Sequence, residues 1–384
     1  MHRSQWTIFQ KPVLGQSIGG FGMTQRPMRV FVLEIAGRGG ICHYTWNLLG
    51  HYGPAAEVTL YTGHPYELAD TLPGFAVRPI FRRFATNPLA VLGMFGDALR
   101  RRPDVVHLQV SQFPTVMLGL ALGFRTLGIP VVITAHNVVS HEYRLWQGLV
   151  FGALYSVARR VIVHSEDSAR TIAARFRVAP ERIRTIDHGN YMFFDSDRKP
   201  SFQTVAPFRV LFFGYIRPYK GLSVLLEALA RLPADMPFYL EIVGRPVEPF
   251  RPYQELINRL GLSDRVETRL DYVPNDEVSE IFSRASVVVL PYLNIAQSGV
   301  LQLAYAFGKP VVVTATGGLP EVVEHGKSGF VIPRGDPVAL EECLQALMLK
   351  PELAERMGRR ARELAETRFS WTRIAPLNLE ACQP

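Results

Sequence analysis

The sequence has few cysteines and none of the spacings that accompany metal sites. Its three cysteines, Cys42, Cys343 and Cys382, lie far apart along the chain. This sparse usage excludes a disulfide-rich scaffold and a Cys/His zinc site, and it predicts a reducing compartment. We expect no metal in the functional site and, separately, no cofactor.

Long hydrophobic runs and a secretory leader are also missing. The longest apolar run, near Leu145–Ala158, contains Gln147 and falls short of the roughly 20 residues that span a bilayer. Residues 1–27 lack the basic-then-apolar order of a signal peptide, and we interpret them as an N-terminal extension, with Met28 as an alternative start of the protein. These absences predict a cytoplasmic protein, with peripheral association at the inner face of the plasma membrane as an additional hypothesis.

The charge balance is basic, but no nucleic-acid motif accompanies it. The net charge is +8, without a long Lys/Arg tract or a paired aromatic RNP motif, so nucleic acid is not an expected partner. Two basic clusters, Arg82–Arg83 and Arg100–Arg102, have apolar Ile80, Phe81 and Phe84 near the first. They make an anionic membrane surface a candidate partner, against the alternative of ordinary surface charge.

A repeated pattern is what the sequence does contain. Short β-branched runs are followed by loops rich in Gly, Ser or Asn and then by amphipathic helices, as in doubly wound parallel sheets. The length of 384 residues suits two such domains. The sequence thus predicts an α/β protein with two Rossmann-like domains facing across a cleft. The expected strands are Arg29–Ile35, Glu57–Thr62, Asp104–Gln109, Pro130–Ala135, Arg160–His164, Phe208–Phe213, Pro237–Val243, Arg265–Thr268, Ser286–Leu290 and Pro310–Thr314.

The domain boundary is predicted where the repeated pattern is interrupted. Residues 192–206 carry no clear period and several polar breakers, so we interpret them as a linker. The first domain is then expected over residues 28–195 and the second over residues 207–365. Ligands of such sheets bind beyond the carboxyl ends of the strands, so the residues that follow each strand are the candidate site.

Two motifs follow strands of the first half. Gly39 and Gly40 end a Gly-Arg-Gly-Gly loop that lets a ligand approach the backbone and a helix N-terminus, or that forms only a tight turn. His136 follows the fourth strand, where it would point into the cleft and hydrogen-bond a ligand or help to position the reacting centre. The alternative is a capping His-Asn pair with Asn137 as the N-cap.

A more informative motif follows the first strand of the second half. Phe213–Gly221 joins a strand to a helix, and it places Arg217 and Lys220 three residues apart between Gly214 and Gly221. Two cations beside a positive helix end suit a diphosphate and the charge that develops when it leaves. The alternative is a solvated basic loop.

A last motif opens an otherwise apolar helix. Four residues precede or begin that helix: Gln297, Ser298, Gly299 and Val300. The free backbone N–H groups at the start of the helix suit phosphate or sugar oxygens. The alternative is an ordinary helix start capped by Ser298.

In this order, the motifs resemble the retaining family-four glycosyltransferases over most of residues 28–375. The matching segments are Gly39-Gly40, Val106–Gln109, Thr134–Asn137, Phe213-Gly214 with Arg217 and Lys220, Ala304–Val312 and Gly317–Glu321. The resemblance implies a GT-B fold and a final segment, residues 366–384, that packs back on the first domain.

The resemblance also implies roles for the motifs. Arg217 and Lys220 would bind the donor diphosphate, Gly40 would lie near it, and His136 would face the transferred sugar. The leaving phosphate would assist attack on the same face, without a protein nucleophile. The family's two glutamates are replaced by Ile295 and Leu303, so the chain resembles a subset in which Gln297, Ser298 and Gly299 supply donor contacts.

The predicted function is therefore a retaining glycosyltransferase of the hexosyltransferase type. It would move a sugar from a nucleotide-diphosphate donor to a glycan or lipid-linked acceptor, in bacterial polysaccharide or glycolipid biosynthesis. Two alternatives stay open: a catalytically degenerate sugar-nucleotide-binding protein, and a GT-B-fold sugar-nucleotide epimerase.

Overall fold

The chain divides into two compact units. The computed structural model describes residues 26–69, 73–82, 87–111, 113–138, 145–195, 202 and 207–383. The first unit comprises Met1–His164, Ala169–Ile186 and Trp371–Pro384, and the second comprises Ser165–Ser168 and Asp187–Ser370. The predicted N-terminal extension lies outside the described residues up to residue 25.

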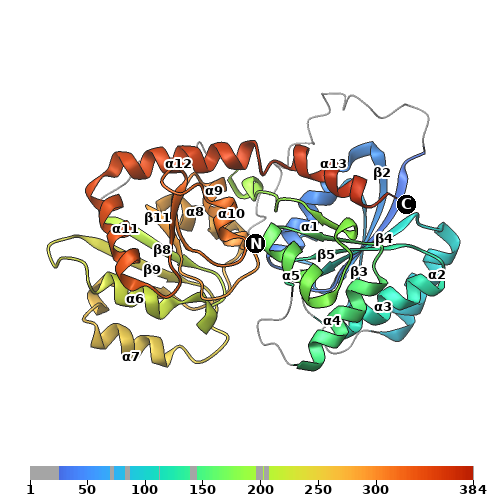
Figure 1. The fold of residues 1–384 in the computed structure, drawn as a ribbon, viewed down its shortest axis with the longest axis horizontal. Coiled ribbons are helices and arrows are strands. Elements are labelled where there is room, and N and C mark those ends of the chain that lie inside the picture. The colour runs from blue at the N-terminus through green and yellow to red at the C-terminus, as the bar shows by residue number, and fades with distance from the viewer. Residues whose placement is uncertain are drawn as a thin grey trace, which may run out of the picture. The chain divides into compact units, whose positions relative to one another are not determined.

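The first unit is built on a seven-stranded sheet in the order β3-β2-β1-β4-β5-β6-β7, in which all pairs are parallel. Helices lie on both sides of the sheet (Figure 1). The strands are β1 (Met28–Glu34), β2 (Ala56–Gly63), β3 (Ala76–Phe81), β4 (Val105–Val110), β5 (Val131–Ala135), β6 (Arg160–Val163) and β7 (Ile183–Thr185). The helices are α1 (Gly40–Gly50), α2 (Pro88–Arg101), α3 (Pro114–Thr126), α4 (Leu145–Val157), α5 (Glu166–Phe176) and α13 (Trp371–Ala381).

The second unit repeats this plan with a six-stranded parallel sheet in the order β10-β9-β8-β11-β12-β13. Its strands are β8 (Phe208–Phe213), β9 (Phe238–Val243), β10 (Val266–Arg269), β11 (Val287–Leu290), β12 (Val311–Thr314) and β13 (Gly329–Ile332). Its helices are α6 (Leu222–Leu229), α7 (Arg251–Arg259), α8 (Asn275–Arg284), α9 (Gly299–Ala306), α10 (Leu319–Val322), α11 (Pro337–Leu349) and α12 (Pro351–Glu366).

Burial explains why these segments adopt these elements. Central strands such as β11, Val-Val-Val-Leu, are buried on both faces, which is why their apolar runs do not alternate. The helices bury one stripe each: Leu225 and Leu229 of α6 pack in one core cluster with Leu340 and Leu344 of α11. The α/β prediction with two parallel-sheet domains is confirmed.

The structure corrects the expected elements in two ways. Strands β3, β7 and β13 were not expected; β3 contains Pro79 and lies half-exposed at a sheet edge, where a weak apolar pattern suffices. The end of the expected first domain is also wrong, because Met192–Asp195 forms a 3-10 turn (η3) in the main segment of the second unit, Asp187–Ser370. Hydrogen bonds across η3, such as Phe194 N–H to the Tyr191 carbonyl, replace the expected linker there.

The C-terminal segment belongs to the first unit. Trp371 and Ile374 of α13 are buried in the same core cluster as Tyr44 of α1. The Arg160 guanidinium at the start of β6 donates to the carbonyl oxygens of Glu380 and Ala381 at 3.3 and 3.1 Å. The end of the chain therefore completes the core that its beginning starts.

The strand order reverses beside β1 and beside β8, and this locates the site loops. In each sheet the first strand of the unit has one neighbour that follows it in sequence and another reached by a crossover, β4 for β1 and β11 for β8. Open α/β sheets bind ligands at such switch points. The loops after β1 and β8 are among those that the sequence analysis selected.

Candidate active site

The loop after β8 holds a buried lysine. Strand β8 ends at Phe213, and a 3-10 turn (η4, Pro218–Lys220) leads into α6. Lys220 is only 8% exposed, and its Nζ lies 5.3 Å from the centre of the Tyr292 ring. It also lies 3.0 Å from where a Cβ on Gly214 would be, and the φ of 97° at Gly214 also favours glycine, so a larger residue there would crowd the ammonium group.

The charge of Lys220 has no internal counterpart among the residues that the structure describes. Burial, and secondarily the neighbouring Arg217, lower the pKa of Lys220 to about 8. No carboxylate in the described part of the second unit forms an ion pair with it, and its ring contact to Tyr292 is a weaker attraction. A buried ammonium group without a counter-charge is unfavourable, so this position favours an anionic ligand.

The structure brings the two predicted motifs of the second unit together. The Leu293 N–H donates to the Tyr219 carbonyl at 2.7 Å, because the loops follow the neighbouring strands β11 and β8. A Cβ on Gly221 would lie 2.0 Å from the carbonyl oxygen of Pro291, and Val300 Cγ2 lies 3.5 Å from the Cβ position of Gly214. Lys220 and the start of α9 thus border the same space.

The start of α9 is capped by Ser298, as the alternative interpretation of this motif predicts. Ser298 is the N-cap, and its Oγ accepts from the Leu301 N–H at 3.4 Å. The Gln297 side-chain oxygen is buried and has no hydrogen-bond partner in the described structure. Ile295 and Leu303, which we expect at the places of the family's glutamates, pack with the apolar cluster around Val288 and Leu290.

The glycine loop after β1 is held by two carboxylates that the sequence analysis missed. Glu34, 2% exposed, accepts from the N–H groups of Ala36 and Gly37 at 2.8 and 2.9 Å and from the Thr62 hydroxyl at 2.9 Å. Burial raises the pKa of Glu34, while these three hydrogen bonds oppose that rise. The sequence did contain a signal for Glu34, because a carboxylate at the end of an otherwise apolar strand is unusual.

The second carboxylate, Glu67, contacts Gly39 directly. The Gly39 N–H donates to Glu67 Oε2 at 2.6 Å, and the same oxygen lies 3.5 Å from Nε2 of His43. Burial lowers the pKa of His43 although Glu67 opposes this. The Gly39 N–H, expected to face a ligand, therefore already has an anionic acceptor within the first unit. Sequence alone gives no signal for this pair, because Glu67 lies far from Gly39 along the chain.

His136 follows β5 as predicted, but it is buried within the first unit. It is 1% exposed, and its Nε2 lies 2.8 Å from Gln109 Oε1 at the end of β4. The rings of Tyr44 and His164 face it, with centroids 4.8 and 5.1 Å away. The expectation that the His136 side chain points into an open cleft is wrong for this structure, because Tyr44 of α1 and His164 after β6 cover the ring. A direct contact of His136 with a sugar stays a prediction.

Within the described ranges, no cluster of His, Cys, Asp and Glu side chains has the arrangement of a metal site. The three cysteines are free thiols. In the same ranges, no helix has both the length and the apolar composition needed to cross a bilayer.

Comparison with known proteins extends these observations to the whole chain. Residues 193–364 match the family described as Glycosyl transferases group 1, and residues 38–189 match Glycosyltransferase Family 4. A protein of Xanthomonas campestris pv. campestris, GDP-mannose:glycolipid 4-beta-D-mannosyltransferase, is 33% identical over 266 residues, 65% of this chain and 69% of that protein.

A second relative and a solved structure agree. MMP alpha-(1->4)-mannosyltransferase of Mycolicibacterium hassiacum is 29% identical over 293 residues, 71% of this chain and 68% of that protein. The crystal structure of Anabaena Alr3699/HepE in complex with UDP-glucose superposes with a TM-score of 0.75 at 21% identity, covering 92% of this chain and 98% of that one. The chain therefore belongs to the glycosyltransferases, with a group 1 C-terminal part and a family-four N-terminal part, and has their GT-B fold.

Proposed function

We propose that the chain transfers a sugar from a nucleotide-diphosphate donor to a glycan or lipid-linked acceptor. The buried ammonium group of Lys220, without a carboxylate partner among the described residues, is the observation that carries this proposal. The relatives named for GDP-mannose and glycolipid, and the neighbour that holds UDP-glucose, support a nucleotide-sugar donor. Bacterial glycolipid or polysaccharide synthesis is the process that fits.

In the proposed mechanism the second unit stabilises the leaving group. Arg217 and Lys220 would neutralise the diphosphate as the bond to the anomeric carbon breaks and negative charge grows on its oxygen. The start of α9 would complete the donor contacts through Gln297, Ser298, Gly299 and Val300. Gly214 would allow close approach of the phosphates. From the first unit, Gly39 and Gly40 would approach the donor, and His136 would face the transferred sugar.

We further propose retention at the anomeric carbon, with the leaving phosphate accepting the acceptor's proton on the same face. The names of the two relatives contain β and α linkages respectively, so the product anomer is the measurement that decides. Proton NMR of the isolated product gives it directly. An inverted product would refute retention and leave the transferase proposal intact.

The transferase proposal is tested by donor binding and turnover. Calorimetry with GDP-mannose and UDP-glucose should detect binding that is lost in Lys220→Ala, while exposed Lys350→Ala, between α11 and α12, serves as the matched control. The rate of sugar transfer to a glycolipid extract should likewise be lost in Lys220→Ala and retained in Lys350→Ala. Equal donor affinity in Lys220→Ala and wild type would remove the proposed site.

The two alternative functions have their own outcomes. The apolar packing of Ile295 and Leu303, where the family has glutamates, is the observation that favours a binding protein without turnover. Such a protein would bind donor and release no free nucleotide with any acceptor or with water. An epimerase would convert the donor without an acceptor.

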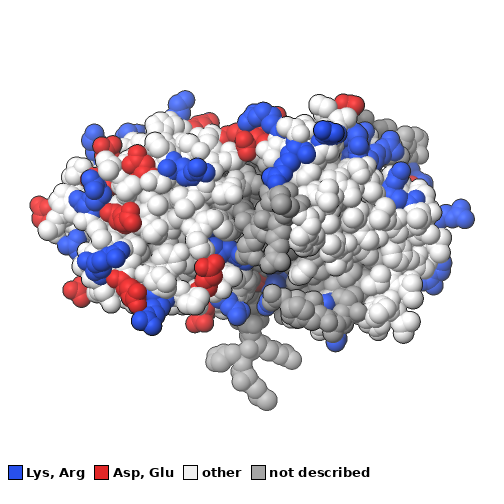
Figure 2. Space-filling view, turned by 60° about the horizontal axis from the view of Figure 1, so that its bottom comes forward, with Lys and Arg blue, Asp and Glu red and all other residues white. Residues whose placement is uncertain are grey.

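A peripheral membrane contact of the first unit is part of the proposal. Helix α2 presents Leu89, Leu92 and Leu99 outward at 72%, 63% and 59% exposure, and α4, which has no charged residue, presents Trp146 and Leu149. The face of this unit seen in Figure 2 is largely uncharged, with lysine and arginine at its margin. Outward leucines bordered by cations suit an anionic bilayer.

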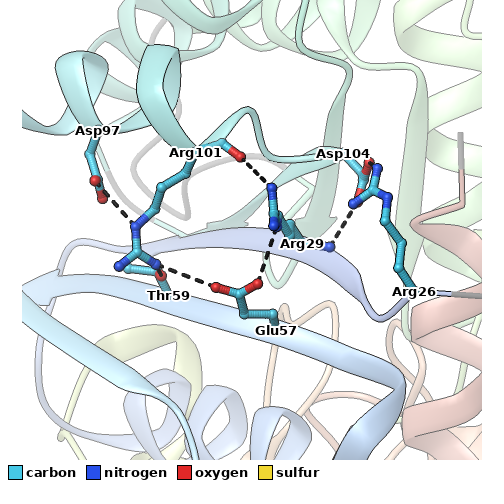
Figure 3. A network of polar contacts seen from close by, with 7 residues as sticks. All are labelled: Arg26, Arg29, Glu57, Thr59, Asp97, Arg101 and Asp104. Atoms are coloured by element: carbon cyan, nitrogen blue, oxygen red, sulfur yellow. Dashed lines mark hydrogen bonds and ion pairs between the residues drawn. The ribbon is translucent and has the colours of Figure 1, made fainter.

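This surface differs from the patch suggested by the sequence. Phe81 is buried, and Arg83 and Phe84 lie outside the described residues. Arg101 forms ion pairs with Asp97 at 3.3 Å and with Glu57 at 3.6 Å, and Glu57 also pairs with Arg29 (Figure 3). Part of the Arg100–Arg102 cluster therefore forms ion pairs with Asp97 of α2 and with Glu57 near the start of β2.

Vesicle flotation tests this contact. Vesicles with anionic phospholipid should float the wild-type protein at low salt, and the triple variant Leu89→Gln, Leu92→Gln, Leu149→Gln should stay at the bottom with unchanged donor binding. Flotation that is equal for both proteins would exclude these helices as the contact.

A further inference from the structure

A buried series of hydrogen bonds in the first unit ends at His136. Gln109 lies between two histidines, with Oε1 2.8 Å from Nε2 of His136 and Nε2 3.3 Å from Nε2 of His107. His107 Nε2 also lies 2.7 Å from the Thr134 hydroxyl, and its Nδ1 lies 3.7 Å from the Cys382 thiol. All five side chains are at most 2% exposed.

The members of this series other than His136 are uncharged at neutral pH. Burial lowers the pKa of His107 to about 3, and burial raises the pKa of the Cys382 thiol to about 12. Thr134 and Gln109 do not titrate. A carboxylate beside a histidine stabilises the imidazolium ion and makes the ring a better base, whereas an amide at the same place offers only a neutral hydrogen bond.

The series also fixes the orientation of His136. Gln109 contacts its Nε2 edge, and the Tyr44 ring meets its face at an interplanar angle of 84°. With the amide oriented as in the structure, its oxygen accepts the Nε2 proton, which selects one tautomer of the neutral ring.

We propose that Gln109 is a positioning residue that holds His136 as a neutral, oriented hydrogen-bonding partner of the transferred sugar, without the carboxylate that would make the ring a stronger base. The inference rests on the proposed transferase function and specifies how one of its residues acts. It agrees with a reaction in which the leaving phosphate, and no protein side chain, accepts the acceptor's proton.

Nitrogen NMR of ¹⁵N-histidine-labelled protein at pH 7 tests the proposal, with the His136 signals identified by their loss in His136→Gln. The wild type should show one pyrrole-like and one pyridine-like ring nitrogen, with the proton on Nε2. Gln109→Glu should convert the ring to imidazolium, and Gln109→Leu should mix the tautomers. In both variants kcat should fall about tenfold, with the donor KM changed less than twofold.

Buried Asn378, which donates to the Ile374 carbonyl within α13, provides the control for loss of a buried amide in the same unit. Asn378→Ala should leave the His136 signals and kcat unchanged. An imidazolium signal in the wild type, or an unchanged ring in Gln109→Leu, would overturn the proposal. Full turnover by His136→Ala would instead remove His136 from the proposed function, while the spectra still report on Gln109.

Discussion

The two units have the same strand order around their first strand, yet the loops that follow these strands differ in their charge balance. After β1, the loop N–H groups of Ala36, Gly37 and Gly39 donate to the carboxylates of Glu34 and Glu67 within the unit. After β8, the loop contains the buried cation Lys220, which no described carboxylate neutralises. At the first switch point, three loop N–H groups already have carboxylate acceptors within the unit, whereas at the second a buried ammonium group has no described carboxylate beside it, which is why we propose that an external anion binds there.

The largest expected effect is on kcat/KM and comes from the loop after β8, which contains Lys220. Lys220→Ala should lower kcat/KM about 10²- to 10³-fold, because a preorganised charge at the leaving group is lost. Steady-state kinetics with the preferred donor measure this. Glu67→Gln, which keeps an acceptor for the Gly39 N–H, should change kcat/KM far less. If Glu67→Gln lowered kcat/KM more than Lys220→Ala, the loop after β1, and not the loop after β8, would be the one that stabilises the leaving group.

The next effect is on stability and concerns close approach in the second unit. Gly221→Ala would place a Cβ 2.0 Å from the Pro291 carbonyl, whereas Gly261→Ala, at the same φ of 68°, meets no atom within 4 Å. Both variants carry the strain of positive φ, about 1–2 kcal/mol. Overpacking should make Gly221→Ala about 2 kcal/mol less stable than its control in urea unfolding. Equal stabilities would mean that the loops after β8 and β11 do not pack as described.

The pH dependence of donor binding sharpens the comparison further. The pKa of Lys220 is about 8 in the free protein, and a bound diphosphate favours the protonated form. Affinity should therefore be constant below pH 8 and should fall at most about tenfold per pH unit above it. A nucleoside without phosphates is the control ligand, and its affinity should not follow this profile. Donor affinity that is flat to pH 10 would separate Lys220 from the phosphates.

The smallest effect distinguishes capping from ligand contact at α9. Ser298→Ala and Asn87→Ala each remove an N-cap, at α9 and α2 respectively, and each should reduce stability by about 1 kcal/mol. If Ser298 also contacts the donor, only Ser298→Ala should raise the donor KM, by several-fold. Thermal unfolding with parallel kinetics gives both quantities, and matching KM values would leave Ser298 as a cap alone.

The sequence predicts the fold well because its main signal, apolar β-branched runs between amphipathic helices, is local. Strand β3 was missed because an edge strand with Pro79 and Arg78 does not need that signal. Lys220 could be selected from its own loop, but its contact with Tyr292 depends on β8 and β11 being neighbours. The burial of His136 depends on the Tyr44 ring of α1 and the His164 ring that follows β6, and the Glu67 contact with Gly39 joins two segments that only folding brings together.

The return of α13 to the first unit has a consequence for synthesis. A ribosome releases residues 187–370 in one continuous stretch, so the second unit can close its core while the final helix is still in the exit tunnel. The first unit, although begun earlier, lacks Trp371 and Ile374 until residues 187–370 have been synthesised. The usual order of maturation, N-terminal domain before C-terminal domain, is therefore reversed in this chain for the final packing step.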